Sequence, residues 1–402
     1  MASMAIIRLL VFFIVFASAL VSCGPQTLPL EYPGSWQEAD LAKQPRWVIA
    51  YPASFRSAVK PLRETRARLG YEVIDLLDPK PSEISETVEK LKLGSRKKDC
   101  LLIIGTQDQI PSPEGVHGRM QGLPADSRYG LAETGITPLF AVGRLPAENP
   151  TEASEMVAKI LAFEKSTSTR PQTGLLLVGN PVGKRNFVAD RFITSLSKRL
   201  MNRAGHSWKF HGAADVGGHP LEVPEADFSR QFHEELTRDY TIGTYFGHSN
   251  DWVFAASGSH LTFPSNDWQS IQKSGNKGLF LSCGCFSLQH NGAGGYQALR
   301  SPGGPVAYIG ASGESYSAIG YLAAQGLMSS MSSNPPETVG EWWLEIQKSI
   351  AARPLNPIIF FAFDRVDGSA KSLFSHGIPL KDQRLEHLEM WMLLGDPATR
   401  LF

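Results

Sequence analysis

The sequence predicts an α/β fold made of two successive parallel α/β sandwich subdomains. Short apolar runs of strand length alternate with amphipathic helical segments, an order typical of parallel strands joined by right-handed crossover helices. The alternation begins at Arg46, breaks at a polar hinge over residues 166–172, and then restarts. The chain has 402 residues, of which 42% are hydrophobic and 19% charged, so it can bury a large core without disulfides.

The first subdomain is expected to contain four strands. Apolar runs place these strands at residues 46–51, 72–77, 100–105 and 139–143. After the first strand, Phe55, Val59 and Leu62 share one face of a helix, and Gly70 follows as its C-cap. A second helix is expected at residues 82–91.

A third helix closes the first subdomain, with Asn149 as its N-cap and Pro150 as its first residue. Beyond the hinge, strands are expected at residues 174–179, 240–246, 278–283 and 305–310, and helices at residues 188–203 and 267–272. We therefore place the boundary in the hinge, with an N-terminal subdomain at 46–167 and a second subdomain at 168–402.

The N-terminal 22 residues are predicted to be a signal peptide. The uncharged, mostly apolar run at residues 9–22 is shorter than the roughly 20 residues that span a bilayer. It ends in Leu20-Val-Ser-Cys23, which resembles the lipobox of bacterial lipoproteins. We expect Cys23 to be lipidated and residues 23–45 to form a tether, which would place the protein in the cell envelope, lipid-anchored or extracellular. The alternatives are an ordinary cleaved signal and an uncleaved membrane anchor.

Charge and cysteine content exclude several classes of protein. Lys plus Arg and Asp plus Glu both number 39, and zero net charge argues against nucleic-acid binding. After Cys23, three cysteines remain: Cys100, Cys283 and Cys285. An odd number in an exported protein argues against a disulfide scaffold, and no cysteine has the spacing of a zinc ligand. No cofactor is therefore expected.

Two reactive side chains follow two expected strands. His248 follows the strand at 240–246, and Cys285 follows the strand at 278–283. Because the carboxyl ends of parallel strands share one edge of a sheet, both side chains are expected at the same edge, where ligands bind in open α/β sheets. An imidazole beside a thiol can take its proton and make it a nucleophile. The alternative is a buried structural cysteine and a hydrogen-bonded core histidine.

Several motifs resemble the gingipain family of cysteine peptidases, which are related to the caspases by fold. The resemblance rests first on Tyr245-Phe-Gly-His-Ser249 and Leu279-Phe-Leu-Ser-Cys-Gly-Cys285. Further stretches resemble family motifs in the same order along the chain, at residues 102–111, 125–129, 142–144 and 392–401. The resemblance implies that the second subdomain is a caspase-like catalytic unit.

The resemblance also implies roles for single residues. It makes His248 the catalytic histidine and Cys285 the nucleophile, and it puts Asn180 where an acid orients the histidine in the family. We expect the backbone at Gly284 and Phe286 to offer N–H groups to an oxyanion. Ser249 stands where the family commonly has glycine, and residues 286–288 also depart from the family pattern.

Substrate and ion sites are expected by the same resemblance. Asp190 and Tyr316 fall at positions that line the specificity pocket of arginine-directed members, and Glu314 is a further candidate counter-charge. These residues favour a basic residue on the acyl side of the scissile bond, the P1 position. Structural calcium, which some relatives carry, has candidate ligands in Asp108, Asp126 and Glu133, although we favour solvated loop charges.

The sequence thus predicts an exported cysteine endopeptidase that cleaves protein or peptide substrates through a thioester. Two alternatives remain open, namely a transpeptidase of the same fold and a catalytically weak binding or scaffold protein. Between the two neighbouring cysteines we favour Cys285 as the nucleophile, because it lies beyond the apolar strand and follows Gly284. Cys283 is expected to be a small core residue beneath the site.

Overall fold

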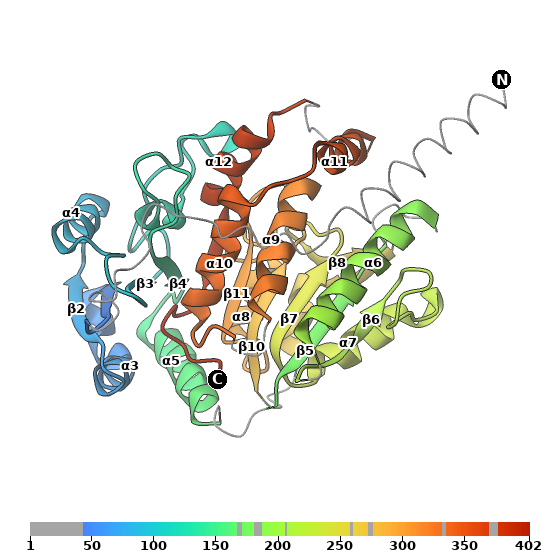
Figure 1. Ribbon diagram of the computed structural model, residues 1–402. Coiled ribbons are helices and arrows are strands. Elements are labelled where there is room, and N and C mark those ends of the chain that lie inside the picture. The colour runs from blue at the N-terminus through green and yellow to red at the C-terminus, as the bar shows by residue number, and fades with distance from the viewer. Residues whose placement is uncertain are drawn as a thin grey trace, which may run out of the picture.

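A computed structural model describes residues 43–166, 171–180, 187–205, 207–257, 260–271, 276–331, 335–369 and 377–402. Its centre is a sheet of ten strands in the order β2-β1-β3-β4-β12-β11-β10-β7-β5-β6. Figure 1 shows this sheet crossing the molecule, from β2 on the left to β6 on the right. The predicted α/β fold is confirmed, and the two expected units share one continuous, mostly parallel sheet.

The N-terminal half is a parallel α/β unit. Its elements are β1 (Arg46–Tyr51), α3 (Arg56–Arg68), β2 (Glu72–Leu77), α4 (Pro81–Leu91), β3 (Cys100–Ile104), β4 (Ala141–Leu145) and α5 (Pro150–Lys165). The caps form as the sequence predicts: the side chain of Asn149 accepts from the backbone N–H of Thr151 and of Glu152 at 3.0 Å. Gly70 follows α3 with φ 88°, the left-handed conformation that ends helices.

The C-terminal half continues the same sheet. Its parallel strands are β5 (Thr173–Val178), β6 (Lys209–Ala214), β7 (Tyr240–Phe246), β10 (Lys277–Ser282) and β11 (Ala307–Ala311). The helices α6 (Phe187–Ala204), α9 (Ser317–Ser330) and α10 (Val339–Ala352) lie in front of the sheet in Figure 1, with α11 (Pro357–Ser369) and α12 (Leu380–Met390) packed against them. The remaining elements, α7 (Phe228–Thr237), α8 (Gly294–Arg300) and the antiparallel hairpin of β8 (Val253–Ser257) and β9 (His260–Pro264), pack against one another.

The last strand joins the two halves. β12 (Trp391–Leu394) runs antiparallel to β11 and pairs in parallel with β4. Directly after it, Asp396 is fully buried and accepts from Trp47 Nε1 at 3.0 Å and from Arg66 Nε at 2.8 Å. Arg66 also pairs with Glu164 at 2.9 Å. A buried ion cluster therefore fastens the C-terminal motif to the N-terminal half, because each of these charges needs its partner inside the protein.

A second buried ion pair joins two of the family-like motifs, at residues 125–129 and 142–144. The guanidinium of Arg144 in β4 binds both carboxylate oxygens of Asp126 at 2.7 Å and donates to the carbonyl of Gly105 at 2.8 Å. Asp126 is therefore committed to a salt bridge. Its role in this structure is to hold the loop that follows β3.

Some elements differ from the expectations. The antiparallel strand β12 breaks the parallel pattern, since its position depends on partners far away in the sequence. The helix expected at 267–272 is a 3-10 helix over Ser265–Ser270. The expected boundary between residues 167 and 168, the signal segment 1–22 and Cys23 lie outside the described residues.

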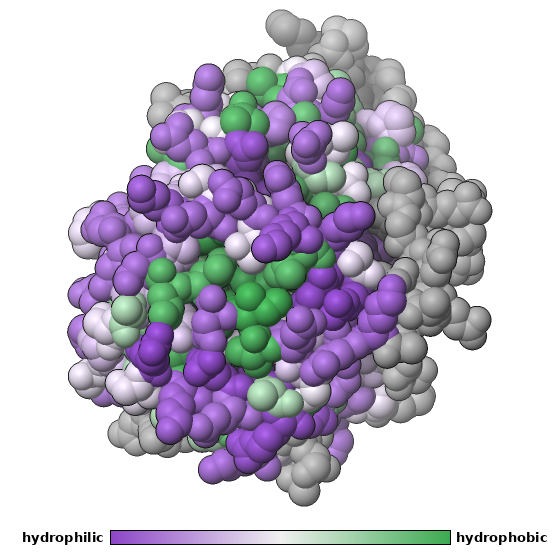
Figure 2. Space-filling view, turned by 90° about the vertical axis from the view of Figure 1, so that its left-hand side faces the viewer, coloured by the Kyte–Doolittle hydropathy of each residue, from purple (hydrophilic) through white to green (hydrophobic). Residues whose placement is uncertain are grey.

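The outermost strand of the N-terminal half is partly exposed. In β2 the inner residues are half-buried and Leu77 has 37% of its surface exposed. Figure 2 shows an apolar patch on the side of the molecule where this strand lies. Within the described part of the chain, no helix combines the length and apolar character that crossing a bilayer requires.

Candidate active site

Neighbouring strands bring His248 and Cys285 to one edge of the sheet. β7 and β10 pair in parallel, with Tyr245 opposite Ser282. His248 and Cys285 each lie three residues beyond this pair. The two loops therefore leave the sheet at the same level, on the edge where the sequence places a site.

A buried tyrosine of β7 fixes the loop that carries His248. The hydroxyl of the fully buried Tyr245 donates to the backbone carbonyl of His248 at 2.6 Å, and the His248 side chain is exposed. A Cβ atom at Gly247 would lie 2.4 Å from that hydroxyl. Glycine is therefore required at 247 for the chain to turn over the tyrosine.

A direct hydrogen bond ties the histidine loop to the cysteine loop. The Oγ of Ser249 donates to the backbone carbonyl of Cys285 at 2.6 Å. A Cβ atom at Gly284 would lie 2.1 Å from the same Oγ, so this bond requires glycine at 284. The serine that departs from the family pattern thus has a structural role, which the motif comparison alone did not reveal.

The Cys285 thiol faces the segment that leads into α9. The backbone N–H of Ser315 donates to its Sγ at 3.4 Å. Burial raises the pKa of the Cys285 thiol to about 11, against the lowering effect of the Ser315 N–H. The carboxylates of Glu314 and Asp367 also raise this pKa, and Arg119 lowers it. The resting thiol is therefore protonated at neutral pH and needs a base to react.

Cys283 faces the same side of the sheet from a deeper position. Its Sγ lies 3.9 Å from the carbonyl oxygen of Gly320 in α9, and it packs against the core. Burial raises the pKa of the Cys283 thiol well above its ordinary value, with no other cause. Cys100 is buried in β3, far from both loops in the sheet order.

Distant parts of the chain hold the segment beside the thiol. Tyr316 N–H donates to Nε2 of the buried His387 in α12 at 3.0 Å, and Trp391 Nε1 donates to Ser315 Oγ at 3.0 Å. Since Nδ1 of His387 lies 2.8 Å from the carbonyl of Gln383, the ring proton is on Nδ1. Burial lowers the pKa of His387 to about 3, so it stays a neutral acceptor.

The two pocket residues expected near the thiol are already engaged. Arg119 donates to the backbone carbonyl of Glu314 at 2.9 Å and lies 3.5 Å from its carboxylate. The same guanidinium stacks over the Tyr316 ring at 4.8 Å and pairs with Glu386. Tyr316 itself is 5% exposed and is the N-cap residue of α9.

Of the remaining predicted residues, Asn180 lies near the site, whereas the side chain of Asp190 is not described. Asn180 is buried just beyond β5, and the neighbouring N–H of Gly179 donates to the carbonyl of Phe246 at 2.8 Å, which puts Asn180 beside the end of β7. Asp190 lies in α6, and its side chain is outside the described part of the structure. Asn180 therefore reaches the same edge as His248.

The backbone around Cys285 differs from the expected oxyanion geometry. Phe286 has φ 56°, and its N–H is donated to the carbonyl of Gly313 at 2.9 Å. The N–H of Gly284 has a long contact of 3.4 Å with Ser282 Oγ. The N–H of Cys285 itself makes no hydrogen bond to any residue that the structure describes. In this arrangement it is the donor left available for an oxyanion.

An acid that sequence reasoning missed lies near the thiol. Asp367 in α11 accepts from the backbone N–H of Ser317 at 3.1 Å and from its hydroxyl, and so caps α9. Burial raises the pKa of Asp367 to about 6. No local pattern marks this residue, because its partner lies fifty residues away in the sequence.

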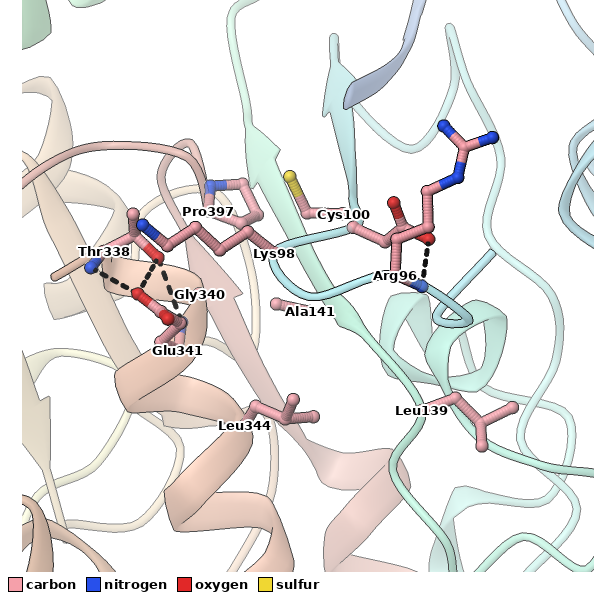
Figure 3. A pocket seen from close by; sticks show the side chains of 11 residues that line it. Arg96, Lys98, Cys100, Leu139, Ala141, Thr338, Gly340, Glu341, Leu344 and Pro397 are labelled. Atoms are coloured by element: carbon pink, nitrogen blue, oxygen red, sulfur yellow. Dashed lines mark hydrogen bonds between the residues drawn. The ribbon is translucent and has the colours of Figure 1, made fainter. Parts of the chain in front are cut away.

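A small pocket lies between the N-terminal strands β3 and β4 and the start of α10 (Figure 3). Cys100 and Ala141, the first residues of β3 and β4, line it together with Thr338 and Glu341 at the start of α10. The lining residues include none from the His248 or Cys285 loops, so this pocket is separate from the candidate site. Among the described residues, no three His, Cys, Asp or Glu side chains gather in a way that could hold a metal ion.

Comparisons with known proteins agree with this geometry. A family model described as peptidase family C25 matches residues 40–402. The complex of Porphyromonas gingivalis RgpB pro- and mature domains has a TM-score of 0.63 at 13% identity, over 88% of this chain and 79% of the other. The Arg-specific cysteine proteinase gingipain R (RgpB) has a TM-score of 0.64 at 13% identity, over 91% and 79%. A structure described only as a protease gives 0.64 at 15% identity, over 89% and 78%.

These structural matches confirm the gingipain-like, caspase-like fold that the sequence motifs imply. No curated protein sequence matches the chain significantly.

Proposed function

Because this chain belongs to peptidase family C25, a family of cysteine peptidases, we propose that it is an endopeptidase whose nucleophile is Cys285 and whose general base is His248. The observation that carries the proposal is the pairing of β7 with β10, which brings both residues to one edge at equal distances from the sheet. The bond from Ser249 to the Cys285 carbonyl supports it, because it holds the two loops together.

In the proposed mechanism, His248 takes the thiol proton as the Cys285 sulfur attacks the scissile carbonyl. The N–H of Cys285 donates to the oxyanion that forms. Collapse of this intermediate breaks the C–N bond, and His248 gives its proton to the leaving amine. Water then hydrolyses the thioester, with His248 again as the base. Asn180 is proposed to orient the imidazole in place of an acid.

The raised pKa of Cys285 supports a proton transfer coupled to attack. A thiol with a pKa of about 11 holds almost no thiolate at pH 7. The proposed reaction therefore transfers the thiol proton to His248 as the sulfur attacks.

A basic P1 residue is proposed as the preferred substrate. The carboxylates of Glu314 and Asp367 both raise the pKa of the Cys285 thiol, so two acidic side chains lie near the acyl side of the site. A solved structure with the same fold is described as an Arg-specific proteinase. Asp190 is a further candidate for the negative charge that would pair with a basic P1 side chain. Glu314 already forms an ion pair with Arg119. Asp190→Ala should lower kcat/KM for Arg and Lys substrates more than for neutral ones. The control Asp227→Ala, at an exposed carboxylate that precedes α7 and pairs with Arg230, should not.

A P1-varied peptide library tests the proposed activity. The parent protein should cleave it, and Cys285→Ala and His248→Ala should each abolish cleavage, while Cys283→Ala keeps most of it. Addition of an amine acceptor separates hydrolysis from transpeptidation, since a transpeptidase forms the amide product instead of the acid. Peptide binding without any turnover would show a binding or scaffold protein.

Export and lipidation at Cys23 complete the proposal. The apolar run that ends in Leu-Val-Ser-Cys supports it, as does the family match, which begins only at residue 40. In a bacterial host the protein should incorporate labelled fatty acid and partition into detergent. If Cys23→Ser leaves both behaviours unchanged, lipidation at this residue is wrong.

A further inference from the structure

Trp252 is the large apolar side chain with the greatest exposed fraction among the described residues, at 68%. It lies four residues after His248, in the loop that leads into β8. A single exposed apolar side chain is common on protein surfaces, so exposure alone assigns no role. The hydrogen bonds that fix its backbone and its contact with His290 are the observations that point to a role.

The backbone of Trp252 is fixed on both sides. The Asn250 side chain accepts from the N–H of Trp252 at 2.9 Å and from the N–H of Val253 at 2.7 Å. The carbonyl of Trp252 accepts from Ser265 N–H at 2.9 Å. The indole is therefore presented by a rigid turn, which lowers the entropy that a ligand contact would cost.

The indole also contacts the loop that follows Cys285. Its ring lies 5.4 Å from the His290 ring, centroid to centroid, at an interplanar angle of 54°. His290 Nδ1 accepts from Gly292 N–H at 3.0 Å, so its proton is on Nε2, which lies 3.6 Å from Asp251 Oδ2. Trp252 thus bridges the loop of the proposed base and the loop of the proposed nucleophile.

The two faces of the sheet separate Trp252 from the thiol pocket. Phe280 of β10 contacts Phe254 of β8, with centroids 5.6 Å apart, whereas Cys283 reaches Gly320 of α9. Residues three apart in an extended segment point to opposite faces. Since Trp252 leads into β8, it lies on the opposite side of the reacting centre from α9, which the Cys285 thiol faces.

This separation gives each half of a bound substrate its own side of the reacting centre. The acyl half is bonded to Cys285 in the thioester, on the side of Ser315 and α9. His248 must reach the leaving nitrogen in order to protonate it, so the amine half passes along the histidine loop. Trp252 continues that loop and stands in the path of the first residues after the scissile bond.

We propose that the Trp252 indole, stacked against His290, is the binding surface for a bulky apolar side chain on the amine side of the scissile bond. This inference rests on the proposed peptidase function and extends it to the leaving half of the substrate. Aromatic and aliphatic side chains can cover an exposed indole and remove apolar surface from water.

Internally quenched peptides with one common acyl half test the proposal. The two residues after the scissile bond are varied among Phe, Leu, Ser and Gly. The parent protein should prefer Phe or Leu by about tenfold in kcat/KM, the scale of one aromatic contact. Trp252→Ala should lose this preference, and Trp252→Phe should keep most of it. The matched control Leu69→Ala, an exposed apolar residue after α3, should keep it in full.

A retained apolar preference in Trp252→Ala would overturn the proposal. A preference for Lys or Arg that depends on Trp252 would also overturn it, in favour of a cation over the indole beside Asp251. Because Trp252 is exposed, thermal melting of each variant should stay close to that of the parent, which excludes unfolding as the cause of any loss.

A binding measurement separates this inference from the proposed function. Calorimetric titration of Cys285→Ala with an uncleaved peptide carrying Phe after the scissile position needs no turnover. The double variant Cys285→Ala/Trp252→Ala should bind that peptide about tenfold more weakly. Equal binding by the two proteins, or no binding by either, overturns the role of Trp252. Absence of Cys285-dependent cleavage in the parent protein overturns the peptidase proposal alone.

Discussion

The hydroxyl of Ser249 donates a 2.6 Å hydrogen bond to the backbone carbonyl of Cys285. Ser249 follows His248 directly, so this bond sets the distance between the two loops on which the proposed chemistry depends. A side chain at residue 284 would clash with the Ser249 hydroxyl, so the bond requires glycine at that position.

Removal of this bond should impair turnover more than folding. Ser249→Ala should lower kcat/KM by about 10- to 100-fold, because small misplacements of catalytic groups cost that much. The free energy of unfolding should fall by only about 1 kcal/mol, the net value of one hydrogen bond. Ser270→Ala removes a similar serine bond, to the carbonyl of Asp267 at 2.7 Å, and serves as the matched control. Equal kinetic losses in both variants would show that Ser249 has no special role.

Gly284→Ala should displace Ser249 by a clash. The new Cβ would lie 2.1 Å from Ser249 Oγ, so the serine must turn away and give up its bond to Cys285. We expect kcat/KM to fall at least about tenfold and stability to fall by about 1–3 kcal/mol, the cost of overpacking. The double variant Gly284→Ala/Ser249→Ala removes the contact with Oγ but leaves the Cβ of residue 249 at 2.9 Å, so it should recover only part of the stability and none of the activity. Full activity in Gly284→Ala would contradict this account.

Tyr245→Phe should loosen the histidine loop. The tyrosine hydroxyl holds the His248 carbonyl at 2.6 Å, and phenylalanine keeps the ring packing while removing that bond. We expect a loss of about 1 kcal/mol in unfolding free energy and about a tenfold loss in kcat/KM. Urea unfolding and steady-state kinetics measure the two effects. A loss of stability with unchanged kinetics would mean that the bond does not position His248.

Asp367 should make stability depend on pH. Its pKa is raised by burial from 3.8 to about 6, so the folded protein binds its proton more tightly than the unfolded chain does. The resulting stabilisation is complete below pH 3.8 and is lost as the pH rises through 6, for a total of about 3 kcal/mol. Asp367→Asn keeps an acceptor for Ser317 and removes this dependence.

The difference in unfolding free energy between the parent protein and Asp367→Asn, measured in urea from pH 4 to pH 7, isolates this effect. Asp382→Asn, at an exposed carboxylate of α12, is the control and should give a constant difference. A constant difference for Asp367→Asn as well would show that burial does not perturb this carboxyl group.

The sequence predicted those elements whose signals are local. The apolar runs that became β1, β2 and β10 and the capped helix α5 are readable from neighbouring residues alone. β6 was missed because its sequence, Lys-Phe-His-Gly-Ala-Ala, has no continuous apolar run. The antiparallel direction of β12 was missed because it follows from pairing with β11, a partner distant in sequence.

The features of the candidate site likewise divide into those with local sequence signals and those that depend on partners far along the chain. The reactive residues at two strand ends were predicted, because strand order and parallel pairing follow from the pattern of the chain. Tyr316 and Glu314 were expected near the site by resemblance, but the way Trp391 and His387 hold this segment was not predicted, since both lie far along the chain. Ser249 gave a signal only as a departure from the family pattern, and its partner appears only in three dimensions.

Cys285, not Cys283, is proposed to form the acyl-enzyme. The two thiols differ in surroundings: the Ser315 N–H reaches the Cys285 sulfur, whereas Cys283 packs against α9. The most direct measurement is acid quenching during turnover of a peptide ester, followed by mass spectrometric mapping of the thioester. The acyl group should be found on Cys285 in the parent protein and in Cys283→Ala, and no acyl group should form in Cys285→Ala. An acyl group on Cys283, or continued turnover by Cys285→Ala, would contradict the proposal.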